Sequence, residues 1–175
     1  MNSNAWGKTL LTIYPYLIKI GDAIDKIVER KALNSFYVSS CDFLKNNVYD
    51  VVDKIIELSE RKVLFLNMKV LVDDCLKKCK RINAKLLIAK FISKKKSNEI
   101  CELLSMPIRT YFRKIKMAES EFEKILNRSG YDSVKLNSYL KDEGWIIDIK
   151  NEFLNSQQDS PIILDAFCLK KKVAL

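Results

Sequence analysis

Basic side chains that could bind a polyanion are concentrated in one quarter of the chain. Of the 31 Lys and Arg residues, 13 lie between residues 75 and 118, where the only acids are Glu99 and Glu102, so this segment has a net charge of +11. The other residues comprise 18 bases and 20 acids. A polyanion such as DNA is therefore expected to bind this particular segment.

The same segment contains a pattern typical of a helix-turn-helix, running from Ser97 to Lys114 as SNEICELLSMPIRTYFRK. A short second helix is predicted over Asn98–Leu104, with Ser97 as its N-cap. A tight turn at residues 105–107 then leads to a third helix, which has Pro107 as its cap or first residue. The first, supporting helix is indicated by apolar residues at helical spacing, namely Ile82, Leu86, Leu87, Phe91 and Ile92.

The third helix is expected to divide into an apolar and a basic face. Its apolar positions follow spacings of three and four: Ile108, Tyr111, Ile115, Ala118 and Phe122. They are predicted to face inward against the second helix, at Ile100, Leu103 and Leu104, and Phe112 broadens that face. The outward positions are Arg109, Thr110, Arg113, Lys114 and Lys116. The outward face is therefore predicted to be almost purely basic.

These outward residues suit contacts with double-stranded DNA. The start of a recognition helix normally touches base edges in the major groove, where Arg can bind guanine through two hydrogen bonds and Thr can contact a thymine methyl group. Arg109, Thr110 and Arg113 are therefore the candidates for base readout.

Phosphate contacts are expected from the flanking residues. The second helix of such a motif crosses the DNA backbone, and its first N–H groups favour a phosphate. The candidates are Lys94, Lys95, Lys96, Ser97, Lys114 and Lys116.

The composition predicts an all-α fold to position these residues. With four Gly and three Pro in 175 residues, the chain has few turn residues. Three helices are predicted in an N-terminal bundle over residues 1–80, at Thr9–Lys31, Cys41–Leu58 and Val63–Cys79. The regular part of the first helix is expected to begin near Pro15. Ala32–Ser40 is expected to be the linker to the second helix, and Ser59–Lys62 is expected to interrupt the helical pattern between the second and the third.

The apolar stripes of the bundle allow two interpretations. One is core packing within a single chain, because an amphipathic helix must bury its stripe against another element. The other is the coiled-coil seam of a homodimer between Asp42 and Cys79, which has the length for it, although the interruption at Ser59–Lys62 breaks a clean heptad register.

The remaining chain is predicted to form the helix-turn-helix domain, 81–128, and a helical extension with a tail, 129–175. Gly130 is expected at the C′ position that ends the third helix. Two short helices are predicted at Ser133–Lys141 and Trp145–Leu154. For the tail from Asn155 onward, a docked extended segment and a frayed terminus are equally compatible with the sequence.

Catalytic and metal sites are not indicated. The chain contains no histidine, which removes the commonest general acid/base. The five cysteines are scattered and expected to be reduced and buried, although Cys75 and Cys79 lie one helical turn apart. The neighbouring acids at Asp73–Asp74 and Asp142–Glu143 are expected on solvated faces. We therefore expect neither an enzyme nor a cofactor.

The chain is expected to reside in the cytoplasm. No apolar run of about 18 residues is present to span a bilayer, and residues 1–8 lack the features of a signal peptide. No membrane partner is therefore expected.

The stretch from Asn83 to Leu126 resembles region four of bacterial sigma factors and the sigma-like helix-turn-helix regulators of Gram-positive bacteria and their phages and mobile elements. In that family the second helix has an E-I-A-x-x-L core and the turn is usually G-I-S. Here Ile100 and Leu103 or Leu104 match, Cys101 replaces the alanine, and Ser105–Met106–Pro107 replaces the turn. The resemblance implies a DNA-binding regulator of transcription, and no convincing sigma region two is visible in the N-terminal half.

Two classes of function follow from the sequence. The first is a sequence-specific transcription regulator that binds double-stranded DNA and whose N-terminal bundle dimerises or contacts another protein, such as RNA polymerase. The second is a helical protein-interaction module whose basic face binds an acidic protein partner. A DNA-packaging accessory protein would use the same motif as the first.

Overall fold

A computed structural model describes residues 5–38 and 45–155, with side chains at 5–33 and 49–155. Every element in these ranges is a helix, which confirms the all-α fold class. None of the described helices is long and apolar enough to cross a membrane. The tail, 156–175, lies outside the described residues, as do Cys41 and Cys168.

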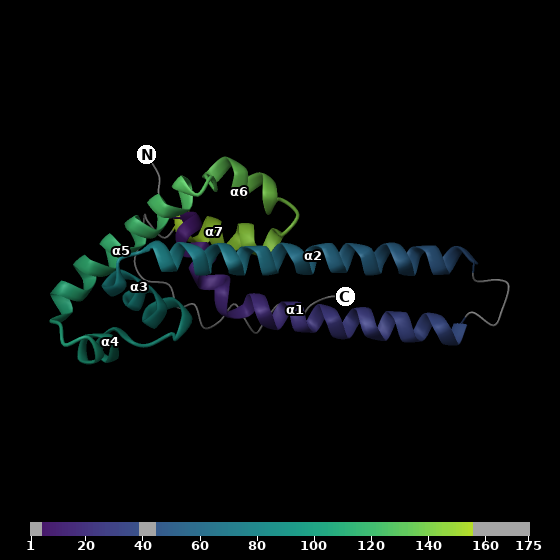
Figure 1. Cartoon of the computed structure of the whole chain (residues 1–175), viewed down its shortest axis with the longest axis horizontal. Helices are drawn as coiled ribbons and strands as arrows, with labels where there is room; N and C mark the ends of the chain where they lie inside the picture. Colours follow the sequence, from purple (N-terminus) through teal and green to yellow (C-terminus); the bar gives the residue numbers. More distant parts are fainter. Residues whose placement is uncertain (1–4, 39–44, 156–175) are drawn as a thin grey trace.

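Two long antiparallel helices, α1 (Ala5–Val38) and α2 (Lys45–Lys78), form a hairpin that projects from the rest of the molecule (Figure 1). This arrangement differs from the three predicted N-terminal helices. The helix α1 begins before Pro15 and includes most of the predicted linker, and α2 runs unbroken through the predicted interruption. The polar residues at 59–61 are exposed, and the Ser59 hydroxyl donates to the Ile55 carbonyl oxygen at 2.8 Å, so they are compatible with a continuous helix.

The helix α1 bends early in its length (Figure 1), and it contains Pro15. Proline has no N–H to donate within the helix, and its ring crowds the carbonyl group one turn earlier, so a helix that continues through it is expected to kink. The prediction that regular structure begins near Pro15 was therefore wrong. The bend lets the first turns of α1 leave the hairpin and pack against later elements.

In the described part of the chain, six shorter elements follow the hairpin. They are α3 (Arg81–Leu87), the π-helix η2 (Ile88–Ile92), α4 (Ser97–Leu103), α5 (Ile108–Arg128), α6 (Ser133–Tyr139) and α7 (Gly144–Asn155). The two predicted short C-terminal helices are thus confirmed as α6 and α7.

Gly130 ends α5 as predicted. It adopts φ +82°, and its N–H donates to Asn127 at 3.0 Å while that of Tyr131 donates to Leu126 at 3.2 Å. This is the Schellman pattern at a helix C-terminus. The Asp132 carboxylate then caps α6 by accepting from the Lys135 N–H at 2.8 Å.

One hydrophobic core includes residues from all three predicted segments. The first turns of α1 contribute some of its most completely buried side chains, including Trp6, Leu10 and Leu11. The helix α1 packs against α2, η2, α5 and α7, so its N-terminal turns lie among elements that are distant in sequence. The hairpin is therefore joined to the basic segment through a shared core.

Two buried acids of α5 bind the first turn of α1. The Gly7 N–H donates to Glu123 Oε2 at 2.6 Å, which satisfies one of the backbone donors left unpaired at a helix N-terminus. Glu119, one turn earlier, forms ion pairs with Lys8 at 3.2 Å and with Lys90 of η2 at 2.7 Å. Buried carboxylates are compatible with a stable fold only when they are paired in this way.

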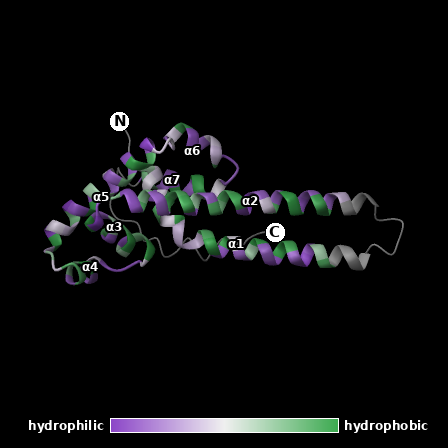
Figure 2. Ribbon diagram, in the orientation of Figure 1, coloured by the Kyte–Doolittle hydropathy of each residue, from purple (hydrophilic) through white to green (hydrophobic). Residues whose placement is uncertain are grey.

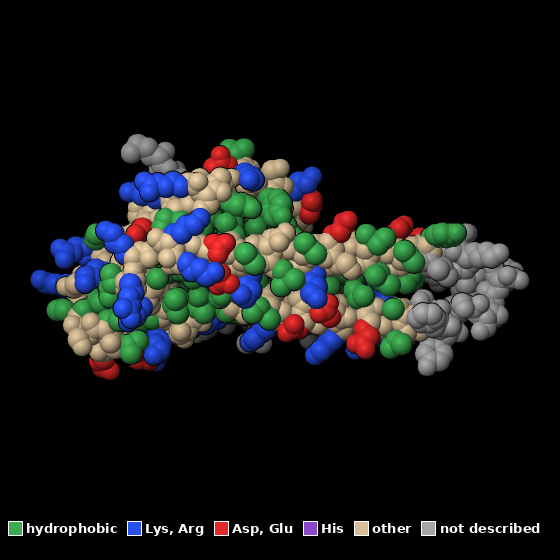
Figure 3. All heavy atoms as spheres, in the orientation of Figure 1, with side chains coloured by type: hydrophobic (Ala, Val, Ile, Leu, Met, Phe, Trp, Pro, Cys, Tyr) green, Lys and Arg blue, Asp and Glu red, His purple; other side chains and the backbone are tan. Residues whose placement is uncertain are grey.

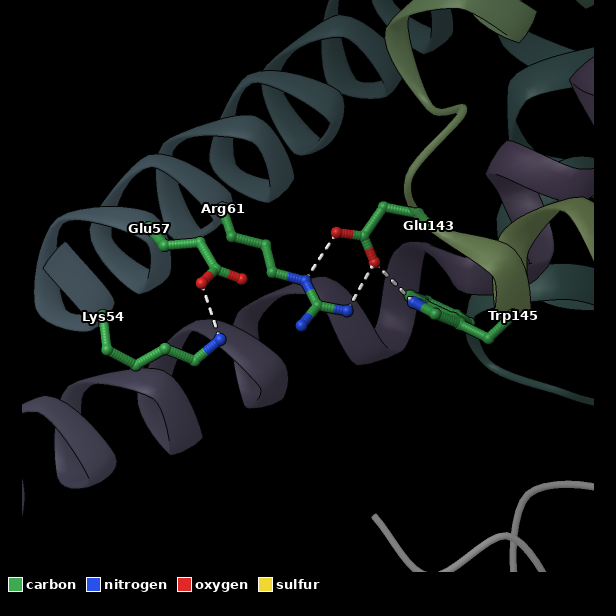
Figure 4. A network of polar contacts seen from close by, with 5 residues as sticks. All are labelled: Lys54, Glu57, Arg61, Glu143 and Trp145. Atoms are coloured by element: carbon green, nitrogen blue, oxygen red, sulfur yellow. Dashed lines mark hydrogen bonds and ion pairs between the residues drawn. The ribbon is translucent and has the colours of Figure 1, made fainter. Parts of the chain in front are cut away.

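A third buried acid attaches α7 to the hairpin (Figure 4). Glu143 accepts two hydrogen bonds from the Arg61 guanidinium, at 2.5 and 2.8 Å, and one from the Trp145 indole N–H at 2.9 Å. The Trp145 ring also packs edge-on against Phe65, with centroids 6.2 Å apart. The prediction of a solvated face at Glu143 was wrong, because its charge is neutralised by an arginine from a distant element.

Gly7 is expected to tolerate no side chain, since an added Cβ would collide with the Glu123 carboxylate and crowd Phe122. We predict that Gly7→Ala lowers the free energy of unfolding by about 1–3 kcal/mol in urea denaturation. Gly21→Ala is the matched control in the same helix. A Cβ at residue 21 would meet only the Lys62 side chain, at an ordinary van der Waals distance. Replacing this helical glycine should therefore raise the free energy of unfolding by about 0.5–1 kcal/mol. Equal effects of the two substitutions would contradict the close approach at Gly7.

Burial raises the pKa of Glu123 to about 7, against the opposing effect of the Gly7 N–H. The folded state therefore favours the protonated acid, and this group's contribution to stability falls as the pH rises from the unfolded pKa near 4.5 through 7. Gln keeps an oxygen acceptor but cannot ionise. We predict that Glu123→Gln gains stability relative to wild type between pH 5 and pH 8.

Urea denaturation of both proteins at the two pH values measures this difference. The absence of histidine removes the groups that would ordinarily titrate in the same range. A stability difference that does not change with pH would show that Glu123 has an ordinary pKa.

Candidate nucleic-acid interface

The turn between α4 and α5 is built by a left-handed residue at Ser105. This residue has φ +48°, its N–H donates to Glu102 at 3.2 Å, and the Met106 N–H donates to Cys101 at 2.9 Å. These are the two bonds of a Schellman motif, so Ser105 occupies the position where glycine is usual. Pro107 follows as the N-cap of α5, as predicted.

The loop from η2 to α4 also contains a left-handed residue. Lys94 has φ +51°, and the Lys95 N–H donates to the Ala89 carbonyl oxygen at 2.9 Å. The helix α4 then begins at Ser97, with Lys96 rather than Ser97 as its N-cap. The Ser97 side chain is instead hydrogen-bonded to Tyr111 of α5, so the predicted N-cap was one residue too late.

The inner face of this region depends on a few fully buried side chains. Ile100 of α4 contributes to the same core as Leu86, Leu87, Tyr111 and Ile115. Burial raises the pKa of the Tyr111 hydroxyl, although the Ser97 hydrogen bond opposes the shift. Ala118 and Phe122 continue the buried stripe of α5, as predicted.

Three residues predicted to face inward are exposed, namely Leu103, Ile108 and Phe112. The seven-residue helix α4 has one buried residue, Ile100, and Leu103 is 59% exposed. Ile108 is the first residue of α5. The Phe112 ring lies edge-on to that of Tyr111, at a centroid distance of 5.2 Å, with over half of the residue's surface exposed.

The outer surface of α5 therefore mixes basic and apolar side chains. Arg109, Arg113 and Lys116 are exposed as predicted, whereas Thr110 and Lys114 are half-buried. Ile108, Phe112 and Met117 are 41–60% exposed on the same helix. Figure 3 shows Lys and Arg gathered at the end formed by α3, α4 and α5, with apolar side chains among them. The expectation of an almost purely basic face was wrong.

The predicted phosphate contacts are in different environments. Lys95 and Lys96 are exposed on the loop before α4, and Ser97 is half-buried beside Tyr111. The Lys94 ammonium donates to the Tyr16 hydroxyl of α1 and lies 4.6 Å from the centre of that ring. Lys94 therefore connects the loop to the hairpin. The sequence pattern does not indicate this role, because Tyr16 is 78 residues away.

The exposed bases of α5 have no acidic partner among the described residues. The ion pairs of the basic segment use other members, such as Lys77 with Asp74 and Lys90 with Glu119. Arg109 and Arg113 are one turn apart near the start of α5, so they project from the same side of the helix. This pair can present two guanidinium groups to an anionic ligand.

Among the described residues, no group of acids, cysteines and histidines is placed to hold a metal ion. Cys75 and Cys79 are buried free thiols, and burial raises the pKa of Cys79 to about 12. Asp73 accepts hydrogen bonds from Tyr14 and Lys69. These side chains take part in packing and ion pairs within the fold.

Comparison of the chain with protein-family models, curated proteins and solved structures finds no match in any of the three.

The left-handed conformation at Ser105 should carry a strain that glycine relieves, because a non-glycine residue costs roughly 1–2 kcal/mol there. We predict that Ser105→Gly raises the free energy of unfolding by about 0.5–1 kcal/mol after the entropy of glycine is included. Ser93→Gly is the control, since Ser93 follows η2 with φ −82° and should gain nothing. Urea denaturation of both variants measures the difference, and a loss of stability in Ser105→Gly would contradict the turn geometry.

Proposed function

We propose that the protein is a sequence-specific regulator of transcription that binds double-stranded DNA through α4 and α5, in the manner of the sigma region-four-like regulators that residues 83–126 resemble. The observation that carries the proposal is the pair of exposed arginines, Arg109 and Arg113, in the first two turns of α5. In this proposal they read base edges in the major groove together with Thr110.

The position of these bases supports a ligand rather than a structural role. The N-terminus of a helix has a partial positive charge, so cations in its first turns are unfavourable for the isolated protein. The first turn of α5 has no acid. A bound polyanion would compensate for the unfavourable cations and for the missing acid at this helix N-terminus. Lys95, Lys96 and Lys116 would add sequence-independent phosphate contacts.

The exposed apolar side chains of α5 favour one alternative function. Aromatic residues and arginine together are typical of protein interfaces, and Phe112 lies between Arg109 and Arg113 in the sequence. The alternative is a protein-interaction module in which this face binds an acidic surface of a partner such as RNA polymerase. In the DNA proposal Phe112 instead contacts thymine methyl groups.

The proposal has two further parts. The protein acts in the cytoplasm, where the DNA is, and it is not an enzyme. The hairpin of α1 and α2 serves dimerisation or contact with another protein.

The proposal predicts different effects at the two kinds of contact. Arg113→Ala should lose about 1–3 kcal/mol of binding on the preferred sequence and much less on random duplex. Lys95→Ala should weaken both similarly and reduce the salt slope by about one. Lys124→Ala, an exposed lysine farther along α5, is the matched control.

Fluorescence anisotropy across a salt series, with fragments first selected from a random duplex library, measures these effects. Equal losses on selected and random DNA for Arg113→Ala would remove its role in readout. If wild-type protein binds no duplex even at low salt, the protein-partner alternative is favoured.

A further inference from the structure

The outward side of α2 carries a regular apolar stripe that no described element covers. Its apolar members are 40–72% exposed: Tyr49, Val52, Ile56, Val63, Leu66 and Val70. With Ser59 they follow spacings of three and four without a break, which is a heptad repeat over 22 residues or about 33 Å of helix. Figure 2 shows apolar residues recurring along α2.

This stripe is separate from the contact that forms the hairpin. Leu58, Phe65 and Val72, which are spaced by seven residues, are buried on another side of α2. In the outer stripe, residues 49, 56, 63 and 70 are the a positions of the heptad, and residues 52, 59 and 66 are the d positions. The three buried residues are then c positions, which point away from the a and d positions. The helix therefore has one apolar side for the protein's own core and a second that faces solvent.

We propose that the outer stripe of α2 is the seam of a parallel homodimer, in which it packs against the same stripe of a second copy. The proposal does not depend on DNA binding. The residue types at the seam favour two parallel strands, because the a positions include Ile56, Val63 and Val70 and one d position is Leu66. Ser59 is at another d position, and its hydroxyl group donates a hydrogen bond to the Ile55 carbonyl oxygen of the same helix.

The charged residues that flank the stripe favour a parallel orientation of the two α2 helices. The e positions carry exposed acids at Asp53, Glu60 and Asp74, whereas the g positions carry Lys62 and Lys69. In a parallel pair each g residue of one helix lies near the e residue five positions later on the other, so Lys69 meets Asp74 of the second copy, while Lys62 lies opposite the neutral Asn67. In an antiparallel pair e would face e and g would face g, which places like charges together. Figure 3 shows acidic side chains beside the apolar ones along the projecting part of α2.

The two lysines already have partners within the chain. Lys62 pairs with Asp25 and Lys69 with Asp73, both at 2.7 Å. Their side chains remain about 30% exposed, so the Lys69 ammonium can add Asp74 of the second copy as a partner. At Asp73, the d position after Val70, the apolar stripe ends.

The size of the stripe fits a second copy. Its exposed apolar surface amounts to roughly 500 Å², near the upper limit for a typical monomer surface. With the flanking polar residues, the buried surface approaches the roughly 800 Å² per partner of a stable protein interface.

A parallel dimer would place both copies of α4 and α5 at the same end of the seam. On the proposed function, this predicts that the preferred DNA site is an inverted repeat.

The oligomeric state tests the proposal directly. Light scattering on the full chain at tens of micromolar should give twice the chain mass of 20.3 kDa. Val63→Glu combined with Val70→Glu should raise the dissociation constant about 100-fold or more, because four carboxylates would be buried in the seam. Ile18→Glu, an exposed apolar position on α1, is the control and should remain dimeric.

Circular dichroism of each variant shows whether the helices are retained. A monomeric wild-type protein would overturn the proposal and leave the stripe to a different protein. A dimer that survives the double substitution would overturn it by placing the interface elsewhere.

Cysteine cross-linking tests the parallel orientation. In a chain with Cys41 and Cys168 replaced by Ser, Val70→Cys should form a disulfide with its own copy upon mild oxidation. Tyr49→Cys mixed with Val70→Cys should give only the two like pairs. A mixed 49–70 disulfide would show an antiparallel dimer and overturn the orientation.

Discussion

The fold depends on how the first turn of α1 is buried. A helix N-terminus has backbone donors without partners inside the helix, and burying them away from water is unfavourable unless an acceptor is supplied. Glu123 supplies that acceptor at Gly7, and Glu119 binds the neighbouring Lys8. Because both acids belong to α5, the hairpin and the basic region share one buried contact. The absence of a side chain at residue 7 allows the two helices to approach this closely.

This contact gives the two halves of α5 different tasks. The second half has buried apolar and acidic residues that hold α1 and η2, whereas the first half presents Arg109, Arg113 and Lys116 to solvent. Lys94, joined to Tyr16, adds a second connection between the hairpin and the loop before α4. A partner bound at α5 would therefore act on a surface that is attached directly to the hairpin.

The sequence predicted what depends on local pattern. Gly130, Pro107 and the periodic positions Tyr111, Ile115, Ala118 and Phe122 are placed as expected, because caps and helical faces involve neighbours along the chain. The predictions failed where a distant element decides the outcome. Periodicity does not show how far a packing partner extends, so Ile108 and Phe112 were placed inside, and the burial of Glu143 requires an arginine 82 residues away. The predicted roles of the basic residues at the interface stay predictions.

The shared contact makes α1 and α5 parts of one cooperative core despite their separation in sequence. Native-state hydrogen exchange measures this directly through the amides of residues 8–11 in α1 and 115–122 in α5. We expect both sets to exchange only through global unfolding, with the same free energy and the same dependence on denaturant. If the α1 amides open at lower free energy while α5 stays protected, the two regions are separate units and the shared contact at Glu123 does not hold the fold together.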